Sequence, residues 1–171
     1  MNHREVEATR EFVARFERGA EWRAEIETLA VAERIDAGVF SAHGTVSDAE
    51  VLFYDQASER HERVVFDEPL TVTSCIGNVS WIEREDARAG GRHEGDGTEE
   101  DEHEGPGGAP RTGRREHEIR AYATFARPSG QALAGRLRGA TVITGECYVR
   151  AFDGSFERVP DGETGIDTLD L

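Results

Sequence analysis

Apolar and polar residues alternate along most of this chain, and a period of two predicts strands with one buried and one solvated face. In Glu118–Ala126, Ile119 and Phe125 fall on one side, while Arg120 and Thr124 fall on the other. The same alternation predicts strands over Thr9–Phe16, Arg63–Phe66, Leu70–Ile82, Gln131–Leu137 and Ala140–Phe152.

The stretch Ala37–Asp55 gives the clearest indication of strands in the chain. It opens with an apolar run and continues through a glycine corner at Gly44 and a turn at Ser47-Asp48. The residues that follow, up to Tyr54, are rich in β-branched and aromatic types, which favour strands. We therefore expect two central strands of a sheet here.

A helical period replaces the alternation in Glu21–Arg34. Trp22, Ile26 and Leu29 share one face, and Glu21 stands in the first turn, where the helix dipole favours an acid. We therefore expect one long helix near the N-terminus. With about seven strands and connections mostly too short for parallel crossovers, the sequence predicts an α+β domain with a largely antiparallel sheet.

One domain accounts for most of the 171 residues. Residues 9–152 form it, preceded by a frayed N-terminus at 1–8 and followed by an acidic C-terminal tail at 153–171. Within the domain, residues 83–116 contain no apolar side chain larger than alanine besides proline, so this stretch cannot offset its ordering entropy. We expect it to be a disordered acidic insertion between two strands.

Charge narrows the class of protein. Acids outnumber bases 35 to 20, for a net charge of −15, and every base is arginine. This composition is typical of proteins from salt-in halophiles, and it argues against a general phosphate-binding surface. The N-terminus resembles no signal peptide and no apolar run approaches a membrane span, so we expect a cytoplasmic protein without membrane contact.

The sequence offers little catalytic chemistry. It has no Gly-x-Ser-x-Gly, no phosphate loop, no Gly-x-Gly-x-x-Gly and no His-x-x-x-His, so we expect a non-enzyme without a cofactor. Cys75 and Cys147 lie in apolar runs and are expected to be buried thiols, with a disulfide as the alternative. His93, His103 and His117 lie in or beside the acidic stretch, where solvated side chains are the expectation and weak metal binding is the alternative.

Several segments in order carry a resemblance to a known family. They are Ala37-Gly38-Val39, Gly44, Ser47-Asp48-Ala49, Phe53-Tyr54-Asp55, Pro69-Leu70, Ile76-Gly77-Asn78-Val79-Ser80, Ala121-Tyr122-Ala123-Thr124, and Gly130 with Leu133 to Leu137. Together they resemble the PPC domain (plants and prokaryotes conserved, also written PCC). The resemblance implies a compact trimeric unit that takes part in DNA-bound complexes. The core of an AT-hook, the DNA-binding segment of plant members, is absent.

The resemblance also directs attention to one cleft. Many prokaryotic members look like metal proteins, with histidines at positions that correspond to Arg120, Tyr122 and Arg136 here. Arginine cannot ligate a metal, so no metal site is expected. The guanidiniums, together with His43 and Asn78, instead make a candidate site for a carboxylate or phosphate. The alternatives are that the arginines pair with acids and that His43 is a hydrogen-bonded histidine at a strand end.

Two functions follow as hypotheses. The first is a non-catalytic homotrimeric binding module that binds DNA or a DNA-bound complex, and the alternative is a small-anion or ligand-binding domain with a pocket of Arg120, Tyr122 and Arg136. For the trimer, uncovered sheet edges invite pairing. Val79, Trp81 and Ile82, near the end of the longest strand-like run, are expected to reach the subunit interface.

Overall fold

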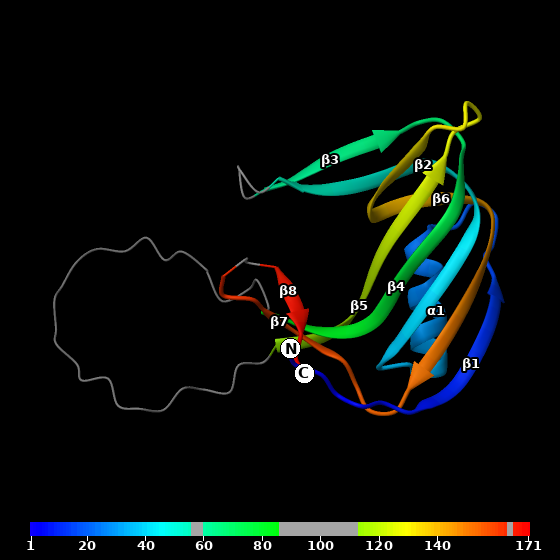
Figure 1. The fold of residues 1–171 in the computed structure, drawn as a ribbon. Coiled ribbons are helices and arrows are strands. Elements are labelled where there is room, and N and C mark those ends of the chain that lie inside the picture. The colour runs from blue at the N-terminus through cyan, green and yellow to red at the C-terminus, as the bar shows by residue number, and fades with distance from the viewer. Residues whose placement is uncertain (56–59, 86–112, 164–165) are drawn as a thin grey trace, which may run out of the picture.

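In the described part of the chain, the fold is one curved, mostly antiparallel sheet with a single helix against it (Figure 1). The computed structural model describes residues 1–55, 60–85, 113–163 and 166–171. In chain order the elements are β1 (Ala8–Arg15), α1 (Trp22–Glu33), β2 (Gly38–Asp55), β3 (Arg60–Phe66), β4 (Leu70–Glu85), β5 (Gly113–Ala126), β6 (Ala132–Phe152), β7 (Glu157–Pro160) and β8 (Asp167–Leu169).

The sheet order is β3-β2-β6-β5-β4-β7-β8, with β1 paired to β6. A further pairing of β2 with β4 closes β2, β4, β5 and β6 into a ring of hydrogen-bonded strands. Among the described strands, the pairing of β4 with β7 is parallel and the others are antiparallel. The predicted α+β class with a largely antiparallel sheet is therefore confirmed.

Two expected breaks in the chain do not occur. Ala37–Asp55 was expected to hold two strands, but β2 is one strand of 18 residues. Its register shifts next to Gly44 in the pairing with β4 and around Asp48 in the pairing with β6. Asp48 has a positive φ of 53°, and it is absorbed as an irregularity within the strand. Gln131–Leu137 and Ala140–Phe152 likewise merge into β6, a strand of 21 residues.

The helix lies where it was expected but is of ordinary length, with 12 residues, so the prediction of a long helix was wrong. The Glu21 carboxylate caps its start by accepting a hydrogen bond from the Ala24 N–H at 2.6 Å. Arg34 ends it in the left-handed conformation, with φ 53° and ψ 53°. The helix therefore has a defined stop before the Asp36-Ala37-Gly38 entry to β2.

The C-terminal stretch is not simply an acidic tail. Residues 153–171 contain β7 and β8, and β7 extends the sheet beside β4 through Trp81↔Glu157 and Ile82↔Arg158. The N-terminal residues also make contacts, since Glu7 and Asp153 exchange hydrogen bonds. At the insertion, residues 83–85 and 113–116 lie in β4 and β5, so its expected bounds were too wide. Residues 86–112 lie outside the described part of the chain.

The core lies between α1 and the inner face of the sheet. Trp22, Ile26 and Ala30 of the helix are buried against strand residues such as Val142 and Phe125. Cys75 and Cys147 are buried free thiols, as expected, and burial raises their pKa to about 11 and about 12. No helix in the described residues is long and apolar enough to cross a membrane.

Gly77 is a point of close backbone approach inside β4. It pairs with Phe40 of β2 and Ala121 of β5, and a Cβ at this position would overlap the Arg120 carbonyl oxygen and the Phe40 ring. Because the neighbours on both sides are strand backbone and a buried aromatic ring, they cannot move aside without disturbing the ladder.

We predict that Gly77→Ala lowers the free energy of unfolding by about 2 kcal/mol through overpacking. Denaturant unfolding at fixed salt measures the change. Gly162→Ala is the matched control, because a Cβ there meets no atom within 4 Å. Equal stability of the two variants would contradict the close approach.

Candidate functional site

The face of the sheet that points away from α1 carries an exposed apolar row. Cross-strand partners point to the same side of an antiparallel sheet, so the register defines this row directly. It runs across β1, β6, β2, β4 and β5 through Val13, Tyr148, Ser41, Ile76 and Tyr122. Val13 is 73% exposed, Ile76 58% and Tyr122 51%, so large side chains on this outer face remain in contact with solvent.

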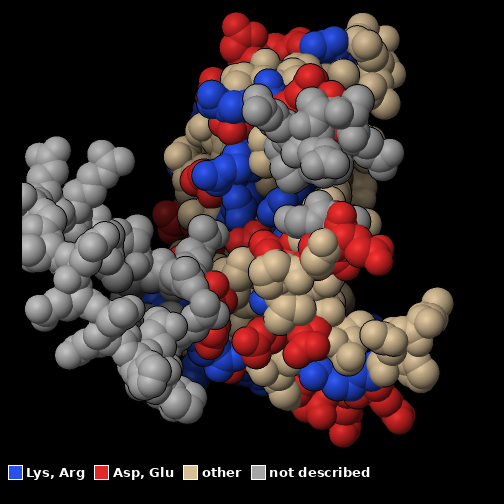
Figure 2. Space-filling model, turned by 90° about the vertical axis from the view of Figure 1, so that its left-hand side faces the viewer, with Lys and Arg blue, Asp and Glu red and all other residues tan. Residues whose placement is uncertain are grey.

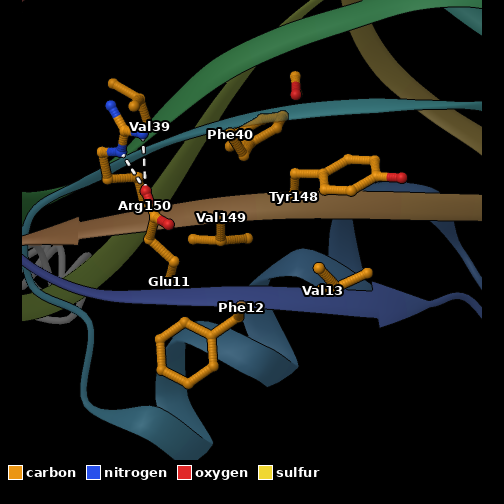
Figure 3. Close-up of a pocket in the computed structure, with 9 residues that line it drawn as sticks. Glu11, Phe12, Val13, Val39, Phe40, Tyr148, Val149 and Arg150 are labelled. Atoms are coloured by element: carbon orange, nitrogen blue, oxygen red, sulfur yellow. Dashed lines mark hydrogen bonds and ion pairs between the residues drawn. The ribbon is translucent and has the colours of Figure 1, made fainter.

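A shallow hollow of about 410 Å³ lies on the β1–β6–β2 part of this face. Figure 3 shows Val13 and Tyr148 on the neighbouring strands β1 and β6, with Glu11 and Arg150 joined by an ion pair beside Val39. That pair is 2.7 Å long, and both side chains are more than half exposed. The hollow is thus largely apolar, with one solvated ion pair at its border.

A second, polar row runs beside the apolar one and leads to a cluster of arginines. It passes through Glu11, Arg150, Val39, Asn78 and Arg120. At its β5 end the neighbouring register pairs are Tyr122↔Arg136 and Ser80↔Glu118. Arg120 is on the outer side of the sheet and yet only 8% exposed, so another element must cover it.

The covering element is the C-terminal pair β7–β8, which supplies Arg158. The Arg158 guanidinium donates from Nε to Ser80 Oγ at 2.9 Å and from Nη2 to Asn78 Oδ1 at 2.7 Å. Its Nη1 donates to the Asp167 carbonyl oxygen at 3.2 Å. Arg158 is 5% exposed, so these bonds hold a buried cation in a single orientation.

Arg120 and Arg136 complete the group. Arg120 Nη1 also donates to the Asp167 carbonyl oxygen, at 2.6 Å, while its buried Nε has no hydrogen-bond partner. Arg136 Nη2 lies 3.1 Å from Glu118 Oε1. Burial lowers the pKa of Arg158 to about 10 and, with the charge of Arg136, lowers the pKa of Arg120. We call Arg120, Arg136 and Arg158 the arginine cluster.

More arginines lie next to the cluster. A polar hollow is lined by Arg23, Arg63 and Arg138 together with acids that include Glu118, the partner of Arg136. Figure 2 shows basic side chains gathered in the middle of the face that carries β3, β7 and β8, with acidic side chains around them. Positive charge is therefore concentrated locally in a chain whose net charge is −15.

The structure brings together most of the candidate residues named from the sequence. Arg120 and Arg136 belong to the cluster, Tyr122 and Asn78 lie next to it, and their role in binding stays a prediction. His43 lies on a different strand, β2. Its Nε2 is 4.0 Å from Glu146 Oε2, and its ring is near that of Tyr148.

Sequence reasoning missed Arg158, Ser80 and Asp167. The available signal was the Phe156–Val159 segment, where Phe156 and Arg158 share one side of an alternating strand. Its position in an acidic stretch hid that pattern.

One of the three expected interface residues needs correction, while the other two stay predictions. Val79 is fully buried in the core of its own chain, so it cannot reach a subunit interface. Trp81 lies on the same side, where its ring stacks on that of His117 with centroids 3.9 Å apart. Ile82 is half-buried beside β7. A bulge between Val72 and Ser74 shifts the alternation along β4 and places Val79 on the buried side.

In the described ranges, no group of three or more His, Cys, Asp and Glu residues could hold a metal ion. His93 and His103 lie outside those ranges. His117 is nearly buried, and its Nε2 is 3.8 Å from Asp36 Oδ1. The cluster is instead built from side chains that carry positive charge and only donate hydrogen bonds.

We predict that Glu118→Gln destabilises the fold by roughly 3 kcal/mol, because it leaves Arg136 and its buried neighbours without their nearby carboxylate. Urea unfolding at constant ionic strength measures the loss. Glu11→Gln is the control, because its ion pair with Arg150 is exposed and such pairs contribute about 0–1 kcal/mol. Similar losses in both variants would show that Glu118 does not compensate buried charge.

The comparisons with known proteins agree with the fold. The chain superposes on a metal-containing protein from Archaeoglobus fulgidus with a TM-score of 0.77 and 23% identity, over 100% of both chains. For a plant- and prokaryote-conserved protein from Pyrococcus horikoshii the TM-score is 0.75 and the identity 17%, over 100% of this chain and 98% of that one. A candidate DNA-binding protein from Ralstonia eutropha gives 0.68 and 22%, over 93% and 90%.

At these identities the likenesses show the fold alone. No curated protein matches the sequence. The family and these neighbours are described by a conserved domain, by metal content or by DNA binding, and not by an enzymatic activity. Residues 3–95, more than half of the chain, match the Plants and Prokaryotes Conserved domain, and the chain belongs to that PCC (PPC) family.

Proposed function

We propose that this protein is a non-catalytic binding module that works as a homotrimer and takes part in DNA-bound complexes. The observation that carries the assembly is the exposed apolar row on the outer face of the sheet. Large apolar patches on a protein surface mark interaction sites, because leaving them in water is unfavourable.

The occupant that we propose for this face is a second copy of the same chain. The row crosses β1, β6, β2, β4 and β5 without an ionised residue, whereas Glu11 and Arg150 stand at its border. An apolar centre with a polar rim is the usual anatomy of a protein interface. The family resemblance implies a threefold arrangement. A closed ring of three copies leaves none of these faces uncovered.

Net charge opposes this assembly. Each chain carries −15, so subunits repel one another unless salt screens the charges. In molar salt the Debye length falls to about 3 Å, and the apolar contact then outweighs the repulsion. We therefore propose a trimer that is stable in concentrated KCl and dissociates at low salt, in line with the halophilic composition.

We predict that Ile76→Glu gives a monomer in molar KCl while the wild type gives a trimer, because the new carboxylate is buried in the middle of the interface. Light scattering after gel filtration measures the mass. Val31→Glu, at an equally exposed apolar residue on α1, is the control and keeps the trimer. A wild-type monomer at this salt concentration would overturn the assembly, and a trimer indifferent to desalting would overturn the role of charge.

The link to DNA is supported by neighbours that are described as candidate DNA-binding proteins. An acidic surface disfavours general contact with phosphates, because nonspecific affinity comes from positive charge that releases counterions. Of the arginines next to the cluster, Arg23 is half-buried while Arg63 and Arg138 are exposed, and acids that include Glu50 and Glu118 line the same hollow. We therefore propose that a partner protein mediates the contact with DNA.

The expected result is that the purified protein, at micromolar concentration in KCl, leaves genomic DNA fragments unretarded in a gel. Crosslinking in the cells of origin nevertheless recovers DNA with it. Retardation by the purified protein would overturn the mediated contact, and failure to recover DNA would overturn the association with DNA-bound complexes.

A further inference from the structure

The arginine cluster places more positive than negative charge in a poorly solvated position. Arg120 and Arg158 are 8% and 5% exposed, and Arg136 is also largely covered. The carboxylates that act on Arg120 are those of Glu118 and Asp167, and Glu118 also acts on Arg158. Burying a guanidinium without a full counter-charge is costly, so this arrangement favours a further anion.

Donor groups at the cluster remain available. A guanidinium carries five N–H groups, and the Nε of Arg120 is buried with no partner. Burial without a partner costs about 1–3 kcal/mol for a polar group and more for a charged one. Arg120 thus retains a donor in the neighbourhood where Arg136 and Arg158 also meet.

A backbone carbonyl oxygen lies between two guanidiniums of the cluster. The carbonyl oxygen of Asp167 accepts from Nη1 of Arg120 at 2.6 Å and from Nη1 of Arg158 at 3.2 Å. Guanidinium groups are the usual donors to carboxylate and phosphate in proteins, and here two of them are directed at one oxygen. A neutral carbonyl is a weaker partner for two cations than an ionised oxygen is.

The element that supplies this carbonyl is small. β8 has 3 residues and pairs with β7 alone in the described part of the sheet. Arg158, in contrast, is fixed on β7 by Ser80 and Asn78, so it keeps its orientation if β8 moves. A rigid set of donors under a weakly held cover is suited to binding that displaces the cover.

We propose that Arg120, Arg136 and Arg158 bind a small phosphate-type oxyanion at the position of the Asp167 carbonyl oxygen, and that β8 is the lid which the anion displaces. A tetrahedral anion suits the cluster because its oxygens can meet guanidiniums from three strands. A carboxylate is satisfied by a single guanidinium fork. The site lies within one chain, so it does not depend on the trimer or on DNA.

Inorganic phosphate is the probe, measured by calorimetry and thermal unfolding against KCl and potassium acetate of equal ionic strength. We expect one phosphate per chain, a melting temperature raised above that in either control, and faster amide exchange in Thr168–Leu169 when phosphate is bound. A short DNA duplex serves as the second phosphate source, and we expect it to leave phosphate binding unchanged because the site is covered. Equal effects of phosphate and chloride would overturn the site, and unchanged exchange in β8 would overturn the lid.

Conservative variants test the residues. Arg158→Lys keeps the charge but loses the fork, and we expect affinity for phosphate to fall about tenfold. Arg150→Lys, on an exposed arginine of the same face, should leave affinity unchanged. Asp167→Asn removes a competing carboxylate while keeping the carbonyl, and should raise affinity about threefold or more. If Arg158→Lys does not fold, Asp167→Asn decides alone, and unchanged or weaker binding in it overturns the proposal.

Discussion

The long pairing of β2 with β6 is the constraint on which the rest of the structure depends. It runs from Gly38↔Ala151 to Leu52↔Arg136. β1 and β5 pair with β6, and β3 and β4 pair with β2, so that β7 and β8 are the described strands that pair with neither. Gly44 and Gly145 meet in its middle, where a side chain on Gly44 would overlap the Thr144 backbone. A Cβ on Gly145 would instead contact the rings of Phe16 and Trp22. The missing side chain at Gly44 thus allows β2 and β6 to approach, and the missing side chain at Gly145 leaves room for the Trp22 ring of the helix.

Local pattern predicted most of this fold, and it failed where a residue's local preference and its place in the sheet disagree. The alternation and the helical period located α1 and the strand positions, because each reports a buried face. Gly44 and Asp48 read as chain breaks, yet long-range pairing on both sides carries β2 through them. β7 and β8 were hidden because an acidic, short stretch has little propensity of its own and gains its structure from β4.

The candidate site shows the same division between local and long-range information. The family resemblance grouped Arg120, Tyr122 and Arg136, and in the structure they lie on the paired strands β5 and β6. His43 lies on β2 beside Glu146 and Tyr148, and Arg158 was missed; neither position follows from spacing along the chain. Val79 was expected at an interface, but a single bulge in β4 reverses the facing of the residues after it and places Val79 in the core. Register and bulges are set by tertiary contacts, which one sequence does not display.

The C-terminal β7–β8 pair has a consequence for the order in which the protein matures. β7 reaches β4 across a long stretch of chain, and Arg158 bonds to Ser80 and Asn78, which are made far earlier. During synthesis, the ring of β2, β4, β5 and β6 can close as soon as β6 has left the ribosome. The arginine cluster can form only afterwards, when Asp167 has also emerged. A nascent chain can therefore hold a folded sheet before it holds the arginine cluster, and a protease that removes the last strands would return it to that earlier stage.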